Sequence, residues 1–131
     1  MDTSRRRVWW DEYASREFRD CDPQATIAIL PIAAIEQHGP HLPVGVDAAV
    51  NRGMLAALID RLPGDLDIRI LPVQEVGKSN EHLRMPGTLT LPAATLIEAW
   101  TELGLSVARA GLRKLVIVNS HGGNDEVMGI V

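Results

Sequence analysis

The sequence has a single cysteine, Cys21, among its 131 residues. One cysteine excludes an internal disulfide and a cluster of thiolate metal ligands. No stretch approaches the roughly 20 apolar residues of a membrane-spanning helix. Trp9 to Glu12, which follow the amino-terminal arginines, are not the apolar core of a secretory signal. We therefore expect a cytoplasmic protein that has no contact with a membrane.

Excess positive charge is missing as well. The formal net charge is −4, so the chain has no general electrostatic attraction for nucleic acid. Its one basic run, Arg5-Arg6-Arg7, is expected to be a solvated tail. Apolar residues make up 46% of the sequence and charged residues 23%, as in ordinary soluble domains. The length suits one domain over residues 1–131, with residues 1–25 as an amino-terminal arm or short helix.

Three short apolar runs predict strands that are buried on both faces. They are Thr26–Ile32, Ile68–Val73 and Lys114–Asn119. A helical pattern follows each run, so strands and helices alternate as β-α-β-α-β-α. This order implies right-handed crossovers and predicts an α/β fold with a mainly parallel sheet flanked by helices.

The first two helices are defined by their end signals and by apolar spacing. The first begins at Asp47 and stops at Pro63-Gly64. Its apolar residues are Val50, Met54 and Leu58. The second has Pro92 in its first turn and ends at Gly111. Its apolar face comprises Leu96, Trp100, Leu103 and Val107.

The third helix follows His121-Gly122-Gly123 and has only about two turns before the sequence ends. A three-stranded parallel sheet is also small for a fold that must cover both faces. We therefore expect a partial chain with an unpaired sheet edge. Apolar surface would then be exposed at Val116 and Val118, or at Leu96 and Trp100.

All four histidines follow a predicted strand. His38 and His41 come after the first strand, His82 after the second and His121 after the third. The carboxyl ends of parallel strands form one edge of an open α/β sheet, where binding sites are found. We therefore expect these histidines to lie at one site.

Glu36 and His38 are two residues apart in a segment expected to be extended, so their side chains point the same way. A carboxylate beside an imidazole can bind a divalent ion. The alternative is structural: Glu36 pairs with an arginine, and His38 donates a hydrogen bond to a loop carbonyl.

Asp47 and His121 also have two interpretations each. Asp47 heads a helix, where aspartate is a preferred N-cap. The loop stiffened by Pro40 and Pro43 could instead return it to the pocket of His38. His121 is either a ligand or a hydrogen-bonded loop histidine.

Four further polar residues follow the second and third strands. Ser79, Glu81 and His82 are expected to contact the ligands or the substrate rather than a metal. Asn124 either caps the last helix or belongs to the same outer group.

His-Gly-Gly after a strand also opens the oxyanion loop of lipases and esterases. That chemistry requires a Gly-x-Ser-x-Gly nucleophile elbow, and the sequence has none. The phosphate-loop motifs Gly-x-x-x-x-Gly-Lys and Gly-x-Gly-x-x-Gly do not occur either.

Three segments, over about residues 25 to 131, together resemble the creatininase (creatinine amidohydrolase) family. The first runs from Leu30-Pro31 through Glu36-Gln37-His38-Gly39-Pro40-His41-Leu42-Pro43 to Asp47. The second is Gly77-Lys78-Ser79-Asn80-Glu81-His82 with Met85-Pro86-Gly87-Thr88-Leu89, and the third is Val118-Asn119-Ser120-His121-Gly122-Gly123-Asn124. The first and third are highly specific, and all three occur in the family's order.

The resemblance implies a site with two divalent ions, zinc or manganese, that hydrolyses a cyclic or linear amide with metal-activated water. It places Glu36, His38, Asp47 and His121 on metal-ligand positions, with Asp47 as the bridge. It also implies a small-molecule amide substrate and a homo-oligomer, often a hexamer.

The sequence departs from the creatininases proper at Gly123, where they carry a glutamate ligand. Without that carboxylate a second possibility is open. The chain would then be a catalytically inactive fragment or subunit that keeps the fold and acts by association.

Overall fold

The computed structural model describes residues 6–131. Its centre is a parallel sheet in the order β2-β1-β3, formed by β1 (Ile27–Ile32), β2 (Ile68–Ile70) and β3 (Lys114–Asn119). In the register, Ile27 of β1 lies opposite Ile68 of β2 and Lys114 of β3. The helices that flank the sheet are α1 (Val46–Arg61), α2 (Ala93–Arg109) and α3 (Asp125–Ile130).

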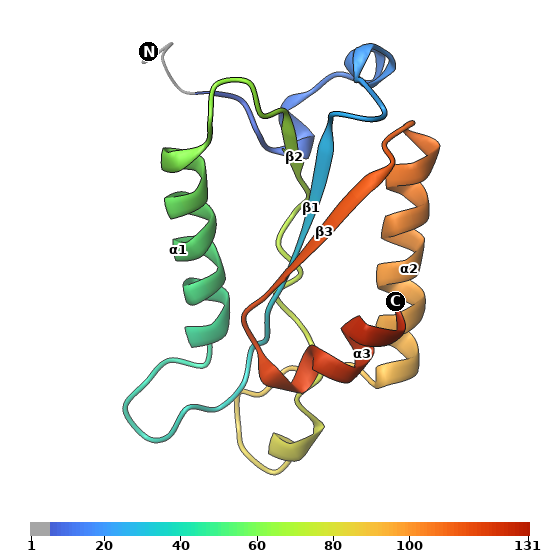
Figure 1. Ribbon diagram of the computed structural model, residues 1–131. Coiled ribbons are helices and arrows are strands. Elements are labelled where there is room, and N and C mark those ends of the chain that lie inside the picture. Colours follow the sequence, from blue (N-terminus) through green and yellow to red (C-terminus); the bar gives the residue numbers. More distant parts are fainter. Residues whose placement is uncertain (1–5) are drawn as a thin grey trace.

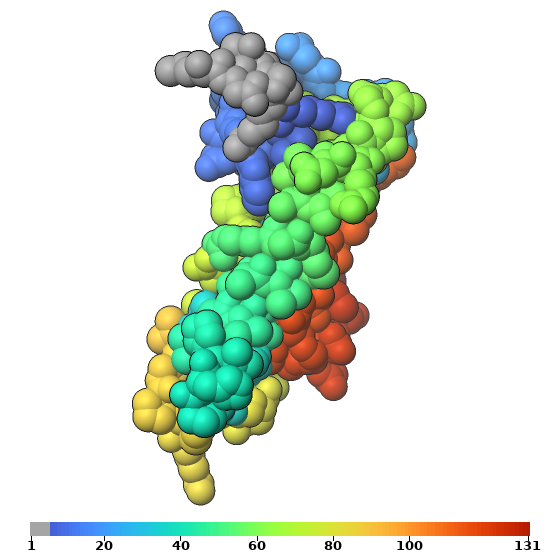
Figure 2. All heavy atoms as spheres, turned by 90° about the vertical axis from the view of Figure 1, so that its left-hand side faces the viewer, coloured from blue at the N-terminus to red at the C-terminus, as the bar shows by residue number. Residues whose placement is uncertain are grey.

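Helices cover both faces of the sheet, with α1 on one side and α2 and α3 on the other (Figure 1). Figure 2 looks onto the α1 side, where this helix runs along the molecule from the loop after β1 towards the amino-terminal arm. The predicted α/β architecture with a parallel sheet is therefore confirmed. None of the helices in residues 6–131 is long and apolar enough to cross a membrane.

β1 is buried on both faces because a helix covers each of them. Leu30 belongs to the core on the α2 side, together with Leu96 and Trp100. Its neighbour Ile29 belongs to the core on the opposite side, together with Leu55 of α1. The predicted apolar face of α2 is correct, but the expected exposure of Leu96 and Trp100 is wrong. Each is only 1% exposed, because the strands of this chain already cover them.

The interior face of α1 differs from the predicted one. Val50 and Met54 are 49% and 40% exposed. The buried positions are Ala48, Asn51 and Leu55. The Nδ2 group of Asn51 donates hydrogen bonds to the carbonyl oxygens of Ile32, at 3.0 Å, and Val118, at 3.1 Å. Asn51 thus satisfies two strand carbonyls inside the protein, which the spacing of apolar residues does not reveal.

The second strand is shorter than its apolar run. Leu71 N–H donates to β1, but the next donation to β1 comes from Gln74, to Pro31, at 2.9 Å. A regular ladder would have used Val73. Pro72 lies at this irregularity, and proline in sheets is confined to edges, strand starts and bulges.

β3 is the open edge of the sheet within the described residues. Leu115 and Val116 are 37% and 48% exposed, and Val118 is partly buried. Exposure of Val116 agrees with the expectation of a small sheet that leaves apolar surface uncovered.

The amino-terminal arm packs at the other edge, beside β2. Ile70 N–H donates to the Val8 carbonyl at 2.7 Å, so the arm begins as an extra strand-like partner of β2. Two 3-10 helices follow, Trp10–Glu12 and Ser15–Asp20. The arm thereby removes most of one sheet edge from solvent.

The basic run is solvated in part, as Arg7 is exposed, but Arg6 and Arg7 are bonded to the rest of the protein rather than free. Arg6 donates a hydrogen bond to the Pro63 carbonyl at 2.7 Å. Arg7 forms an ion pair with Glu17 at 2.7 Å. Arg5, the first residue of that run, lies outside the described residues.

Candidate metal centre

The loops that follow the three strands meet at the carboxyl-terminal edge of the sheet, at the lower end of Figure 1. They bring Glu36, His38 and Asp47, from the loop after β1 and the start of α1, together with His121, which follows β3. His121 Nδ1 lies 3.2 Å from Glu36 Oε1 and 3.0 Å from Asp47 Oδ2. His38 Nε2 lies 3.3 Å from Asp47 Oδ1. Two carboxylates and two imidazoles therefore face one small space.

The orientation of His121 is set on its far side. Its Nε2 lies 2.8 Å from the Lys78 carbonyl and 3.4 Å from Ser79 Oγ. A carbonyl only accepts hydrogen bonds, so Nε2 carries the hydrogen and a neutral ring presents a lone pair at Nδ1. That lone pair faces Glu36 and Asp47. Metal-binding histidines commonly donate their other N–H to a backbone carbonyl in this way.

His38 shows the same arrangement with its nitrogens exchanged. Its Nδ1 lies 3.0 Å from the Glu36 carbonyl oxygen and donates to it, which leaves the Nε2 lone pair facing Asp47. The bond of His38 to a loop carbonyl, which was its structural alternative, is therefore present, and it does not exclude a role as a ligand. Glu36 has the imidazoles of His82 and His121 rather than an arginine as its basic neighbours.

Asp47 does not cap a helix. α1 begins at Val46, Gly45 is its N-cap residue, and no side chain makes a capping hydrogen bond there. Asp47 lies in the first turn instead, where the helix dipole favours a negative charge. Its two oxygens face different imidazoles, those of His38 and His121.

The donor atoms fit a divalent cation. Glu36 Oε2 and Asp47 Oδ2 are buried and have no hydrogen-bond partner. Asp47 Oδ2 faces the Nδ1 lone pair of His121, so two electron-rich atoms lie 3.0 Å apart. A cation between carboxylate and imidazole would satisfy both, and such mixed N and O donors are typical ligands of zinc and related metals. Glu36, His38 and Asp47 also offer ligand atoms within 4.8 Å of one another.

His82 lies at the rim of this centre, and in its neutral ring the hydrogen is on the nitrogen that faces the centre. Gly39 N–H donates to Gln37 Oε1 at 3.0 Å, which orients the amide so that Gln37 Nε2 donates to His82 Nδ1 at 2.9 Å. In a neutral ring the hydrogen is then on His82 Nε2, 3.6 Å from Glu36 Oε2. Gln37 lies between Glu36 and His38 in the first motif, but no spacing or residue-type signal in the sequence indicates its contact with His82.

Asn124 joins the three loops and does not cap α3. It stands at the N-cap position, but its side chain makes no capping bond there. Its Oδ1 accepts from Lys78 N–H at 3.0 Å, and its Nδ2 donates to the Ala33 carbonyl at 3.0 Å. Gly77 passes so close that a Cβ there would overlap the Ala33 carbonyl oxygen and the Asn124 amide. This contact fixes the middle loop, which carries Lys78, against the other two.

The other sequence-predicted residues lie as follows. Ser79 is fully buried beside His121, as expected of a group that contacts a ligand. Glu81 is exposed, and its Oε2 lies 3.8 Å from Lys78 Nζ. His41 is exposed and lies outside the candidate ligand groups.

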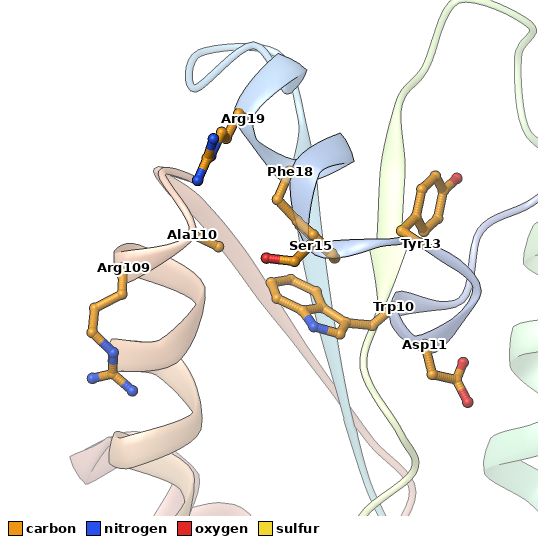
Figure 3. A pocket seen from close by; sticks show the side chains of 8 residues that line it. All are labelled: Trp10, Asp11, Tyr13, Ser15, Phe18, Arg19, Arg109 and Ala110. Atoms are coloured by element: carbon orange, nitrogen blue, oxygen red, sulfur yellow. The ribbon is translucent and has the colours of Figure 1, made fainter.

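A surface pocket of about 500 Å³ shares no residue with this centre. It lies at the opposite end of the sheet, between the arm and the end of α2 (Figure 3). Aromatic rings of Trp10 and Phe18 and the guanidinium groups of Arg19 and Arg109 contribute to its lining. The convergence of donor atoms, rather than cavity size, therefore identifies the candidate site.

Comparison with known proteins agrees with this geometry. The family model of creatininase, described as creatinine amidohydrolase, matches residues 11–131. Mycofactocin precursor peptide peptidase of Mycolicibacterium smegmatis is 32% identical over 112 residues, which cover 84% of this chain and 45% of the peptidase. Creatinine amidohydrolase of Pseudomonas putida is 32% identical over 118 residues, which cover 86% of this chain and 42% of that enzyme.

The fold is shared with solved structures. A manganese form of creatininase matches with a TM-score of 0.81 and 26% identity, over 95% of this chain and 49% of that chain. The chain thus spans less than half the length of the relatives it matches. The family match over most of its length, with 32% identity to two curated members, shows that the chain belongs to the creatininase family.

Proposed function

We propose that this chain carries the metal centre of an amidohydrolase that uses two divalent ions, zinc or manganese. The observation that carries the proposal is the pair formed by Asp47 Oδ2 and His121 Nδ1. The two atoms lie 3.0 Å apart in the interior. His121 donates a hydrogen bond from Nε2 to the Lys78 carbonyl on the far side, so its neutral ring has a lone pair at Nδ1 to offer to a metal. Glu36, His38, Asp47 and His121 are the proposed ligands, with Asp47 as the bridge because its two oxygens face different histidines.

Bound divalent ions in such a site polarise a carbonyl and lower the pKa of water towards about 7. The chain's own residues hold the ligands in place for this. The Lys78 and Glu36 carbonyls fix the two imidazole rings, and Asn124 fixes the loop that carries Lys78. His82 presents an N–H at the rim, where it is available to a substrate oxygen or to Glu36.

The proposed substrate class is a small amide, cyclic or linear. Two of the similar proteins are described as a peptide peptidase and a creatinine amidohydrolase, and both names denote hydrolysis of C–N amide bonds. We place this activity in the cytoplasm. The rest of the substrate pocket is not assigned to residues of this chain.

The test combines metal analysis with hydrolysis on the same preparation. The chain is dialysed against zinc or manganese, its metal content is measured, and hydrolysis of creatinine and of a short peptide is followed. We expect bound metal in the wild type and loss of metal in His38→Ala with an unchanged circular dichroism spectrum. Hydrolysis by this chain alone is expected to fall below the ordinary enzyme range of about 1–1000 per second. Unchanged metal content in His38→Ala would refute the proposal.

The alternative function is association without catalysis. It is favoured by the exposed β3 edge and by glycine at position 123. We propose that the chain forms oligomers in either case, because an open strand edge invites pairing. Sedimentation velocity tests this proposal: Val116→Lys, which places a charge on the edge strand, should shift the chain towards monomer.

A further inference from the structure

The two oxygens of Glu36 face different groups. Oε1 lies 3.2 Å from His121 Nδ1, inside the proposed centre. Oε2 faces the middle loop, where His82 Nε2 lies 3.6 Å away, beyond hydrogen-bond distance. Glu36 is only 7% exposed, and Oε2 has no hydrogen-bond partner. A buried carboxylate oxygen without a partner requires an explanation, because burial of an unpaired charge is costly.

A second carboxylate approaches the same space. Glu36, Glu81 and His82 each offer a ligand atom, and these atoms lie within 4.8 Å of one another. The charged partner of Glu81 is Lys78, whose Nζ lies 3.8 Å away at the exposed surface, so this pairing contributes little. Two carboxylates at this separation repel each other unless a cation lies between them.

The absence of a side chain at Gly123 leaves room for the Glu81 carboxylate. A Cβ on Gly123 would lie 3.0 Å from Glu81 Oε1 and 2.5 Å from both His121 Nε2 and the Lys78 carbonyl oxygen. Any side chain at position 123 would therefore displace Glu81 and the support of His121. Gly123 and Glu81 thus share one region, and the side chain that fills it is that of Glu81.

His82 is the weaker ligand of the three. Gln37 Nε2 donates to His82 Nδ1, so the hydrogen of the neutral ring lies on the nitrogen that faces Glu36. A metal needs a lone pair at that nitrogen. The two carboxylates remain as the donors that this space offers to a cation.

We propose that Glu81 is a ligand of the metal centre. Its carboxylate and Glu36 Oε2 hold a divalent ion on the middle-loop side of Glu36. The absence of a side chain at Gly123 leaves room for the Glu81 carboxylate. The inference rests on the proposed function, because it adds a ligand to the same centre. Glu81, on the middle loop, would then supply the carboxylate that is missing at Gly123, where the creatininases proper carry a glutamate.

The experiment measures zinc bound per chain by equilibrium dialysis and elemental analysis, using the full chain and zinc alone. Glu81→Gln should bind one zinc ion fewer than the wild type, or bind that ion more than about 100-fold more weakly, which exceeds the loss caused by removing an outer hydrogen-bond partner of a ligand. Glu98→Gln, which removes a similar exposed carboxylate from α2, is the matched control and should leave the zinc count unchanged. Circular dichroism melting verifies that each variant is folded.

A rescue variant separates coordination from charge. Histidine is a good zinc ligand but cannot replace a negative charge, so Glu81→His should restore the wild-type zinc count. If Glu81→His loses zinc as Glu81→Gln does, or if Glu81→Gln keeps the full count, Glu81 is not a ligand. A wild-type chain that binds no zinc would instead overturn the proposed function itself.

Discussion

His121 Nδ1 and Asp47 Oδ2 lie 3.0 Å apart, and the same imidazole ring donates from Nε2 to the Lys78 carbonyl at 2.8 Å. In the neutral ring the carbonyl fixes the hydrogen on Nε2, so the carboxylate then faces a lone pair at Nδ1. The contact is between two electron-pair donors, which becomes favourable when a cation lies between them.

Replacement of Asp47 tests whether this contact serves a metal. Asp47→Asn removes the charge of a proposed ligand, so we expect binding of zinc or manganese to weaken by more than the upper limit of about 100-fold for an outer hydrogen-bond partner, measured by isothermal titration. The free energy of unfolding of the apoprotein should change little, because Asp47 makes no capping bond to α1. Asp60→Asn, at an exposed position near the end of the same helix, is the control. Metal binding equal in both variants would contradict the assignment.

The two glycines after His121 should respond differently to alanine. A Cβ at Gly123 would press on His121 Nε2 and the Lys78 carbonyl, both at 2.5 Å, whereas a Cβ at Gly122 meets nothing within 4 Å. Gly123→Ala should weaken zinc binding by about 10–100-fold, the usual effect of disturbing the hydrogen bond behind a metal-binding histidine. Gly122→Ala should bind zinc like the wild type. Equal affinities in the two variants would show that the Lys78 carbonyl does not support the centre.

Asn124 should be important for stability. Asn124→Ala removes bonds from Lys78 N–H and to the Ala33 carbonyl inside the protein, and leaves those groups without partners. We expect a loss of about 2–4 kcal/mol in the free energy of unfolding, measured by urea denaturation. A smaller loss than about 1 kcal/mol would mean that water replaces the side chain.

Gly77 tests the same junction from the other side. Gly77→Ala would force a Cβ against the Ala33 carbonyl oxygen and the Asn124 amide, and should destabilise the chain by about 1–3 kcal/mol. Gly64→Ala is the matched control, because a Cβ there meets nothing within 4 Å and surface changes usually stay within about 0.5 kcal/mol. The two effects at Gly77 and Asn124 should not be additive, since both break one contact.

The arm should give the stability of the protein an acid-sensitive component. The Arg7 guanidinium and the backbone N–H of Ala14 lower the pKa of Glu17 from its ordinary value of 4.5 to about 2. A folded-state pKa below the unfolded one stabilises the fold above about pH 4.5, and this stabilisation is lost as the pH falls from 4.5 towards 2. Urea denaturation should therefore show Glu17→Gln less stable than the wild type at pH 7, with the difference vanishing at low pH. In an Arg7→Met background the difference in the free energy of unfolding at pH 7 should be smaller. A difference between Glu17→Gln and the wild type that does not depend on pH would refute the ion pair as its cause.

The sequence by itself determined the elements and the edge of the sheet at which the site lies. β1 and β3 follow from apolar runs, and the face of α2 that contains Leu96 and Trp100 follows from helical spacing, because burial repeats with the period of the element. The placement of His38 and His121 at one edge follows from the alternation of strands and helices, since parallel strands end at the same edge.

Only the tertiary structure decided how the side chains of that edge face one another. The rotation of α1 depends on strand carbonyls that Asn51 meets from two different strands. The hydrogen on His121 depends on the Lys78 carbonyl, and Asn124 holds that loop in place. These are distances between atoms far apart in the chain, and local periodicity contains no information on them. For the same reason Glu81, read from the sequence as an outer residue, came within ligand distance of Glu36 only when the loops were packed together.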